Sequence, residues 1–516
     1  RYGVQSQALR EEMAEWAYLL SNESPDYAMY RATNSGRMIA ADKEPGVRPL
    51  CCGEIFMRLW GGCCMAAETR AYARGACGNI QACAGLKSGI EGMIHSVRAI
   101  WPESAGWTHD RGTDEQPAVP FQLQLDNAEK ASGAPANPNE EQDMTDEQSD
   151  KLATQEEEQV EPEKDADTPP DLTAAPDEEE DDDEPVAHWD AAEMDEVDPG
   201  SSVRVEQSRY VANSGFGSLL IDAKNAFNEM NRYLMLWQVR HRWGRGSRFA
   251  FNRYRHHSII YVRDRPGDAP HIILGKEGVN QGCVFGSVCY GIGLMPIAER
   301  MREEVPEALQ PLFADDITAA GQAGHNAACL AFLKVHGPVY GYYPEPSKSI
   351  YVCKGEDEAV AQMAFVAKRI TGVTFKCGHR YLGSYVGCRE LKEEYVRDKV
   401  SVWVGAIKIL TKLAPKYPQA VYCGYTLCLQ NEWQFLCRTT PDIAVLLEPV
   451  ERALRKELLP AFLGVDACDV SNSFRELLAL AIKRGGMGIR NPMATAEEFY
   501  DTSVSCTSYL VDTLIK

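Results

Sequence analysis

Three aspartates, each next to an apolar run, constrain this chain more than any other feature of its sequence. Leu219-Leu220-Ile221 is an apolar run that ends on Asp222, and Leu312-Phe313-Ala314 leads into Asp315 and Asp316. Short apolar runs of this kind predict buried strands. Two strand ends that bring carboxylates to one point can bind a pair of hard divalent cations. Such a two-metal site is a common means of in-line displacement at a phosphate.

The adjacent pair Asp315-Asp316 gains its meaning from its surroundings. Two neighbouring carboxylates repel and are costly to bury, and a bound cation pair removes that cost. Adjacent acids also occur at Asp181-Asp182-Asp183, where nothing about the neighbours indicates a site. The pair at 315–316 differs because apolar residues flank it and a third aspartate ends another apolar strand. We therefore interpret Asp222, Asp315 and Asp316 as metal ligands.

The net charge of −22 is unevenly distributed along the 516 residues. The segment Asp126–Asp198 contains 29 Asp and Glu against 3 Lys, which leaves 50 basic and 46 acidic residues elsewhere. The rest of the chain is therefore mildly basic, and binding to phosphate depends on such local positive charge. The overall acidity does not exclude a nucleic-acid partner.

Residues 104–203 are rich in Pro, Glu, Asp and Ala and poor in aromatic and β-branched residues. A segment of this composition buries too little apolar surface to offset its ordering entropy. We predict a disordered acidic insertion. Three roles are open for this segment. It could be a solvated spacer, a contact for a basic partner, or an electrostatic mimic that covers a nucleic-acid groove.

The 17 cysteines contain no C-x-x-C pair, and most lie in apolar runs. We interpret them as buried free thiols in a reducing compartment. The longest apolar stretch, 284–298, is short for a membrane span and contains three glycines and a proline. We therefore expect an intracellular protein, nuclear or cytoplasmic, without a membrane partner.

The order of motifs resembles the palm of a reverse transcriptase, and the form around Asp222 is most similar to that of non-LTR retroelements. The order is Asp222, then Gln281-Gly282, then Asp315-Asp316, then Lys348 in Pro346-Ser347-Lys348-Ser349. The resemblance implies an RNA-directed DNA polymerase, a nucleotidyltransferase. It further implies two Mg²⁺ ions, with Mn²⁺ as an alternative, and an RNA template, a DNA primer and deoxynucleoside triphosphates as partners.

The resemblance also implies roles for single residues. Asp222, Asp315, Asp316 and Lys348 would be catalytic, with Lys348 near the leaving pyrophosphate. Nucleotide-binding residues would be Lys43 and Arg48 in the fingers, Phe227 as the ring that excludes a 2′-hydroxyl, and Gln281 under the template base and the incoming nucleotide. Arg380-Tyr381-Leu382-Gly383 resembles the primer grip, which implies that Arg380, Tyr381 and Gly383 hold the primer end.

Basic and aromatic residues alternate between Arg240 and His257. This composition is typical of a surface that follows a phosphate backbone while rings stack on bases. It is also found in a solvated face whose aromatic residues lie in the core. We interpret Arg242, Trp243 and Arg248 as template contacts.

The expected fold is α+β, a right-hand polymerase with fingers, a palm with an antiparallel sheet, and a helical thumb. We assign residues 1–103 to the N-terminal fingers region and 104–203 to the acidic insertion. Residues 204–378 form the palm with a fingers insertion, 379–392 the primer-grip hairpin, and 393–516 the helical thumb and C-terminal extension.

Two other functions stay open. The family carries an acidic or small polar residue and a proline after Gln-Gly, where this chain has Cys283-Val284. The chain could therefore be a decayed retroelement remnant that binds nucleic acid without synthesis. Alternatively, it is an interaction protein that acts through the acidic segment.

Overall fold

The computed structural model describes residues 6–42, 47–78, 80–83, 88–101, 215–263 and 269–515. It has a mixed helical and sheet architecture, and most strand pairs are antiparallel. This confirms the predicted combination of helices with an antiparallel sheet. The acidic segment 104–203 lies outside the described residues. Within them, no helix is both long and apolar enough to cross a membrane.

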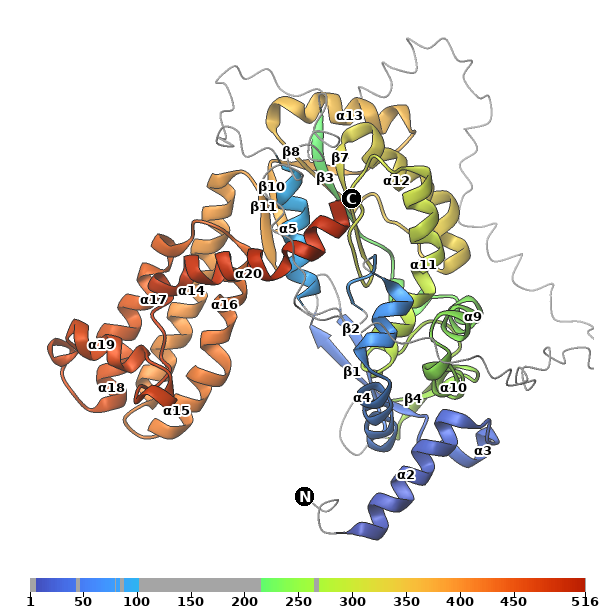
Figure 1. Ribbon diagram of the computed structural model, residues 1–516, viewed down its shortest axis with the longest axis horizontal. Coiled ribbons are helices and arrows are strands. Elements are labelled where there is room, and N and C mark those ends of the chain that lie inside the picture. Colours follow the sequence, from blue (N-terminus) through green and yellow to red (C-terminus); the bar gives the residue numbers. More distant parts are fainter. Residues whose placement is uncertain are drawn as a thin grey trace, which may run out of the picture. The chain divides into compact units, whose positions relative to one another are not determined.

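The N-terminal part combines helices with a sheet that is completed from later in the chain (Figure 1). Its elements are α2 (Gln7–Asn22), α3 (Tyr27–Tyr30), β1 (Gly36–Asp42), β2 (Val47–Gly53), α4 (Ile55–Cys77) and α5 (Gly89–Ile100). The four-stranded sheet has the order β2-β1-β4-β5, with β4 at Ser258–Val262 and β5 at His271–Gly275. In this sheet the pair β1–β4 is parallel, and the pairs β1–β2 and β4–β5 are antiparallel.

A five-stranded sheet forms the centre of the molecule, in the order β6-β7-β3-β8-β9. Its strands are β3 (Phe216–Ile221), β6 (Leu312–Phe313), β7 (Asp316–Gln322), β8 (Ile350–Cys353) and β9 (Thr374–Lys376). The pairs β6–β7, β7–β3 and β3–β8 are antiparallel, and β8–β9 is parallel. The predicted strand before Asp222 is confirmed, and β6 and β7 form a hairpin whose turn lies between Phe313 and Asp316.

Both faces of this sheet are covered, which explains why β3 is apolar throughout. Leu219 and Ile221 contribute to the largest apolar cluster of the protein, whereas Phe216 belongs to a second cluster, against which Leu220 packs. Successive side chains of a strand point to opposite faces. Asp222 follows Ile221 by one residue and therefore lies on the face of Leu220.

Helices between the strands complete the central part (Figure 1). They are α8 (Ala226–Glu229), α9 (Arg232–Arg242), α10 (Gly244–Tyr254), α11 (Gly286–Glu304), α12 (Ala323–His336), η1 (Gly337–Tyr340), η2 (Gly355–Asp357) and α13 (Glu358–Ala367). Helix α12 contacts β3 and β7, and α13 packs on α12. They cover the face of the sheet to which Leu219 and Ile221 point.

From Gly378 on, a hairpin leads into a helical part with its own apolar core. The hairpin consists of β10 (Gly378–Tyr381) and β11 (Ser384–Gly387). The helices are α14 (Arg389–Leu413), α15 (Pro418–Gly424), η3 (Tyr425–Leu429), α16 (Gln430–Thr439), η4 (Ala444–Leu447), α17 (Glu448–Ala453), η5 (Leu454–Leu458), α18 (Leu459–Leu463), η6 (Ala467–Asp469), α19 (Asn472–Ala479), η7 (Ile482–Arg484) and α20 (Pro492–Ile515).

The last helix, α20, packs on α16 and on α5 and so links the two ends of the described chain. A Cβ at Gly92 of α5 would lie 2.3 Å from the Leu510 side chain, so glycine is required for this close approach. The buried His95 lies in the same contact, with its Nε2 3.0 Å from the hydroxyl of Ser503. Burial and the neighbouring charge of Arg98 lower the pKa of His95 to about 4.

His95 should make the protein sensitive to acid in a defined window. The unfolded chain takes up a proton at this residue near pH 6.5, whereas the folded protein resists it down to about pH 4. The free energy of unfolding should therefore fall between pH 6.5 and 4, by up to about 1.4 kcal/mol per pH unit. In His95→Gln this part of the fall is absent. Urea unfolding at pH 7 and pH 5 measures the difference.

The control is His257→Gln, at an exposed position, which should keep the acid sensitivity of the wild type. Equal losses of stability in the wild type and His95→Gln would show that the proton linkage lies elsewhere.

Candidate active site

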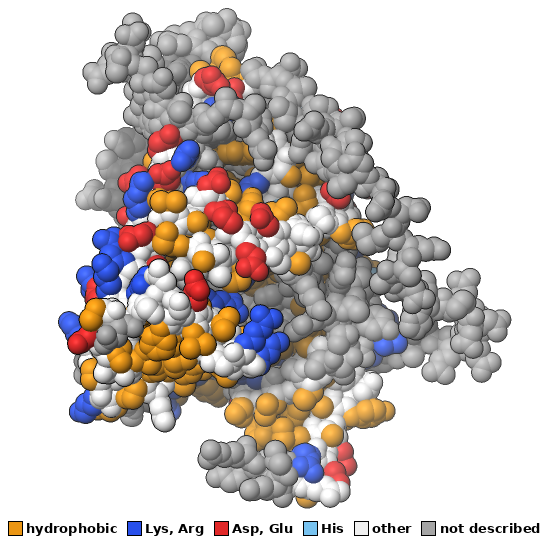
Figure 2. Space-filling model, turned by 60° about the vertical axis from the view of Figure 1, so that its left-hand side comes forward, with side chains coloured by type: hydrophobic (Ala, Val, Ile, Leu, Met, Phe, Trp, Pro, Cys, Tyr) orange, Lys and Arg blue, Asp and Glu red, His pale blue; other side chains and the backbone are white. Residues whose placement is uncertain are grey.

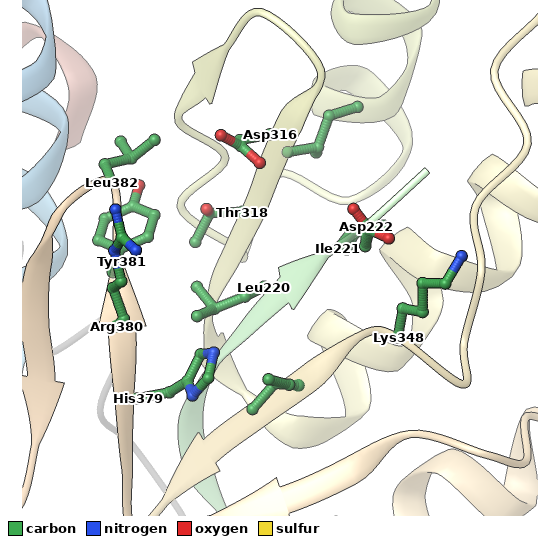
Figure 3. Close-up of a pocket in the computed structure, with 12 residues that line it drawn as sticks. Leu220, Ile221, Asp222, Asp316, Thr318, Lys348, His379, Arg380, Tyr381 and Leu382 are labelled. Atoms are coloured by element: carbon green, nitrogen blue, oxygen red, sulfur yellow. The ribbon is translucent and has the colours of Figure 1, made fainter. Parts of the chain in front are cut away.

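The register of β3 and β7 places Asp222 opposite Asp316. Ile221 pairs with Ile317 and Leu220 with Thr318 in this antiparallel pair. The next pair in the same register is Asp222 and Asp316. Figure 3 shows both carboxylates at the ends of these adjacent strands, on the face of Leu220 and Thr318. Both residues also line one cavity, together with Leu220 and Thr318.

Asp315 lies in the turn between β6 and β7, beside Ala314. Ala314 has φ of +56°, at the first of the two turn residues. Tight hairpin turns of type II′ need a positive φ at this position and usually have glycine there. An alanine in the left-handed region costs about 1–2 kcal/mol. Contacts with the surrounding chain must therefore hold this turn in place.

The side chain of Gln81 holds the turn. Its Nε2 donates to the carbonyl oxygen of Ala314 at 3.1 Å, and its Oε1 accepts from the Ala314 N–H at 2.7 Å. Gln81 is buried, and the neighbouring Ala82 N–H donates to the carbonyl of Leu312 at 2.9 Å. One residue thus satisfies both backbone groups of the strained alanine. This fixes the backbone that carries Asp315 and Asp316.

Tyr342 is a buried phenol that interacts with all three aspartates. Its hydroxyl donates to the backbone carbonyl of Asp315 at 3.2 Å. Burial raises the pKa of Tyr342 well above its usual value, and the charges of Asp315, Asp316 and Asp222 raise it further. All three carboxylates therefore act on a single buried phenol. The phenol stays protonated and keeps its hydrogen bond to the turn.

The donor set at this point fits magnesium. Among the described residues, no group of three or more His, Cys, Asp and Glu side chains is placed to hold a metal. Mg²⁺, however, is commonly bound by one or two carboxylates together with water and substrate phosphates. Like charges directly opposite in a sheet are destabilising, and a cation between Asp222 and Asp316 would relieve that repulsion. These two are the ligands that would hold it, with Asp315 adjacent in the turn.

Lys348 is brought beside Asp222 by the loop before β8. The Glu345 N–H donates to the carbonyl of Asp222 at 2.8 Å, and the Asp222 N–H donates to the hydroxyl of Ser349 at 3.3 Å. The Lys348 ammonium forms an ion pair with Glu345. Its hydrogen bond to Glu345 raises the pKa of Lys348, and the charge of Asp222 raises it further. Lys348 therefore carries a positive charge at the edge of the site.

Phe227 and Gln281 are connected through the loop 277–282. The Phe227 ring stacks on Tyr290 with centroids 4.4 Å apart, and its carbonyl accepts from the Val279 N–H at 2.6 Å. The carbonyl of Gln281 accepts from the Cys51 N–H at 2.9 Å. Gly282 follows with φ of +101°, and a Cβ there would lie 2.8 Å from the Cys51 carbonyl oxygen. The loop is thus bonded to α8 on one side and to β2 on the other.

The predicted primer-grip hairpin lines a cavity of about 210 Å³ together with the carboxylates (Figure 3). Arg380 is exposed, whereas Tyr381 is buried. Burial raises the pKa of Tyr381, whose side chain belongs to the apolar cluster that contains Phe216 of β3. Gly383 has φ of +86° in the turn. The cavity lining is Leu220, Ile221, Asp222, Asp316, Ile317, Thr318, Lys348, Ile350, His379, Arg380, Tyr381 and Leu382.

The three residues predicted as template contacts have other surroundings. Trp243 is buried and stacks on Phe285 with centroids 5.2 Å apart, so its ring is unavailable to a base. The guanidinium of Arg242 forms two hydrogen bonds with the carboxylate of Glu299, at 2.8 and 2.6 Å. The half-buried Arg248 donates to the hydroxyl of Ser24. The expectation that Trp243 contacts a template is corrected, because its ring is packed in the core.

Lys43 and Arg48 are the two nucleotide-binding residues predicted in the fingers. Lys43 falls outside the described residues. Arg48 lies on β2 and pairs with Ala41 of β1. The structure thus places the backbone of Arg48 on the strand that contacts Gln281 through Cys51.

The helical part presents a second hollow of about 390 Å³ along α14. Arg397 and Lys408 line it together with apolar residues such as Val400 and Val404. On the face that Figure 2 shows, hydrophobic side chains likewise border on Lys and Arg side chains. Such a combination suits contact with a polyanion that also has apolar surfaces.

Gln81 and Tyr342 are residues of the site that motif spacing did not identify. Both act on backbone groups of the turn, and a contact between side chain and backbone leaves no residue pattern in the sequence. A weak signal existed for Tyr342, which directly precedes the Tyr343-Pro344-Glu345-Pro346 segment before Lys348. Gln81 lies in Asn79-Ile80-Gln81, where no residue type by itself indicates a contact with the distant Ala314.

No protein-family model and no curated protein sequence matches the chain. Among solved structures, the chain is similar to apo telomerase from Candida tropicalis, with 11% identity over 99% of this chain and 72% of that chain and a TM-score of 0.35. The same telomerase truncated from its C-terminal domain has 11% identity over 73% of this chain and 59% of that chain, with a TM-score of 0.31. Telomerase from Candida albicans in complex with a fragment of telomeric RNA has 8% identity over 57% and 49%, with a TM-score of 0.26. All three scores lie below 0.5, so function is inferred here from the geometry of the site.

Gln81→Met should impair the site more than the fold. The substitution keeps the volume of the side chain but leaves the N–H and C=O of Ala314 without their partner, at a cost of about 1–3 kcal/mol per group. For the polymerase activity that the resemblance to reverse transcriptases implies, we expect primer extension by the folded protein to fall about a hundredfold, as for a displaced catalytic group. Primer extension measured beside thermal unfolding checks this.

Gln310→Met is the matched control, because Gln310 is also buried and its amide donates to the carbonyl of Val305 at 2.7 Å, away from the turn. It should destabilise the protein similarly and leave extension by the folded fraction intact. Equal loss of activity in both variants would reduce Gln81 to a purely structural role.

Proposed function

We propose that this chain is an RNA-directed DNA polymerase that adds deoxynucleotides to a primer 3′-hydroxyl. The observation that supports this best is the placement of Asp222 opposite Asp316, beside a cavity that Lys348 and the hairpin 378–387 also line. The motif order that resembles reverse transcriptases supports the same function. The RNA template, the DNA primer and the deoxynucleoside triphosphates are the partners of this proposal.

The proposal assigns the described parts to a right-hand polymerase. The β2-β1-β4-β5 sheet with α2 and α4 would be fingers, and the five-stranded sheet would be the palm. The helices from Arg389 on would be the thumb. In this assignment the basic hollow along α14 would follow the sugar-phosphate backbone of the primer–template.

Asp222 and Asp316 would hold Mg²⁺, with Asp315 supporting them from the turn. Bound there, the ions would lower the pKa of the attacking hydroxyl and offset charge on the departing pyrophosphate. Positioning and electrostatic stabilisation supply most of the acceleration in such transfers. The proposal therefore needs the turn to be rigid, which the contacts of Gln81 and Tyr342 favour.

Lys348 would act on the leaving group. Its ammonium is half exposed and paired with Glu345, and its raised pKa keeps it charged at neutral pH. A cation at this place can offset the charge of a pyrophosphate or donate a proton to it. The exposed Arg380 would contact the primer backbone, while the buried Tyr381 packs in the cluster of Phe216 and so holds the hairpin against the five-stranded sheet.

Phe227 would select the sugar of the incoming nucleotide. The Phe227 ring stacks on Tyr290, which restrains it, and Phe227 follows Asp222 closely in the sequence. A restrained ring at this step would clash with a 2′-hydroxyl, as the resemblance to reverse transcriptases implies. The loop that contains Gln281 is bonded to both α8 and β2, so the replacement by Cys283-Val284 leaves it anchored.

The second candidate function is a remnant that binds nucleic acid without synthesis. Cys283-Val284 in the loop after Gln281 is the observation that favours it. Binding of a primed template without any extension would support this reading.

Asp222→Asn and Asp316→Asn should each lower primer extension on poly(rA)/oligo(dT) with Mg²⁺ by at least about 10²–10³-fold, because each removes a charge that the transition state needs. Binding of the primed template should change little. Asp501→Asn, at an exposed position on α20, is the matched control and should extend like the wild type. Unchanged extension in Asp222→Asn would refute the assignment.

Phe227→Ala should admit ribonucleotides. Removing the ring opens the space for a 2′-hydroxyl, so incorporation of ribonucleoside triphosphates relative to deoxynucleoside triphosphates should rise at least about tenfold. Single-nucleotide extension with each substrate measures the ratio. Phe56→Ala, at an exposed ring on α4, should leave the ratio as it is. A constant ratio in Phe227→Ala would place the gate on another residue.

A further inference from the structure

Helix α9 presents aromatic and cationic side chains together on its exposed face. Tyr233 is 84% exposed and Trp237 is 54% exposed. Arg240 and His241 of the same helix are also exposed, as is Arg245 at the start of α10. Residues three and four apart lie on one side of a helix, so 233, 237, 240 and 241 form one continuous face. We call these five residues the α9 face.

The opposite side of α9 accounts for the packing of the helix. Met235 and Val239 are buried there, and α9 packs on α10 and α11 (Figure 1). The Arg242 guanidinium donates a hydrogen bond to the carboxylate of Glu299 on α11. The rings of Tyr233 and Trp237 are therefore not needed to cover the core. Both rings are therefore accessible on the side of α9 that faces away from the core.

The rings of Tyr233 and Trp237 lie on the same side of α9 as the imidazole of His241. The centroids of Trp237 and His241 lie 4.3 Å apart at an interplanar angle of 56°. Tyr233 precedes Trp237 by one turn. The α9 face thus offers successive flat surfaces along the helix, with the Arg240 guanidinium next to them. Flat aromatic surfaces and arginines are the groups on which unpaired bases stack.

Charge supports a polyanionic partner. From Arg232 to His257 the sequence has seven arginines and three histidines and no Asp or Glu. Several of these arginines serve the fold: Arg232 and Arg253 are buried, and Arg242 is paired with Glu299. Arg240, on the side of α9 that carries the rings, and Arg245, at the start of α10, are exposed. This local positive charge stands out in a chain whose formal net charge is −22.

We propose that the α9 face binds a single-stranded segment of nucleic acid, by stacking bases on Tyr233 and Trp237 and by holding phosphates with Arg240 and Arg245. A duplex fits less well, because its bases are stacked on one another and closed to side-chain rings. None of the five residues lines the cavity that contains Asp222 and Asp316. The α9 face is therefore a second binding site, and it goes beyond the proposed polymerase function.

The test uses the full chain and a fluorescently labelled 20-nucleotide oligouridine, with binding measured by anisotropy. The variant Tyr233→Ala/Trp237→Ala should bind at least about tenfold more weakly, since it removes both rings on which bases would stack. Arg240→Ala/Arg245→Ala should weaken binding and lower the slope of log affinity against log salt by about one to two. Tyr509→Ala, at a 74% exposed ring on α20, is the control and should bind like the wild type.

A second measurement separates the α9 face from the cavity. Oligouridine that carries 5-iodouridine should crosslink on irradiation to the peptide that contains Tyr233 and Trp237, also in the presence of saturating primed template. Extension of a short primed template should be unchanged in both α9 variants. The binding and crosslinking results do not depend on whether the chain polymerises, so failure of the polymerase proposal would leave them interpretable.

Three outcomes would overturn the inference. The aromatic variant could bind oligouridine as tightly as Tyr509→Ala does. The loss of binding could be equal for oligouridine and for an oligoglutamate peptide, which would make the face a site for acidic peptides. The variants could change sedimentation of the free protein and leave oligouridine binding intact, which would make the face an interface between copies.

Discussion

The pairing of β3 with β7 is the interaction on which the rest of the site depends. Its register puts Asp222 opposite Asp316 and turns both toward Leu220 and Thr318. A slip by one residue would move the aspartates of the shifted strand to the other face of the sheet. The register is set by the apolar side chains, because Leu219 and Ile221 must enter one core and Phe216 the other. Hydrophobic packing thus positions charges that would otherwise repel one another.

The strained turn between β6 and β7 is held from outside the sheet. Gln81 comes from the segment before α5, and Tyr342 from the loop after η1. Contacts from two distant segments converge on the turn because a short turn has too few neighbours of its own to stay in a left-handed conformation. Since α20 packs on α5, the helical part also contacts the segment that follows Gln81.

Much of the site could be predicted from the sequence, since it depends on local patterns. An apolar run that ends on Asp222 and apolar residues beside Asp315-Asp316 both follow from the pattern of near neighbours, whereas the strained alanine of the turn does not. Trp243 shows where this reasoning stops. Its neighbours are basic, as on a binding surface, yet its ring stacks on Phe285, far along the chain. On α9 the same composition leaves Tyr233 and Trp237 exposed, and no local pattern separates these from Trp243.

The sequence by itself determined the kinds of groups and their order: carboxylates after apolar strands, a glycine loop between them, a lysine after them, and a mixed helix and sheet fold. It did so because strand periodicity, turn residues and charge are properties of near neighbours. Only the tertiary structure decided which side chains meet. The contact of Gln81 with Ala314, the burial of Trp243 and the exposure of Trp237 each depend on a partner that is distant in the sequence. Such pairings are chosen by the packing of the whole core, which no short stretch of residues encodes.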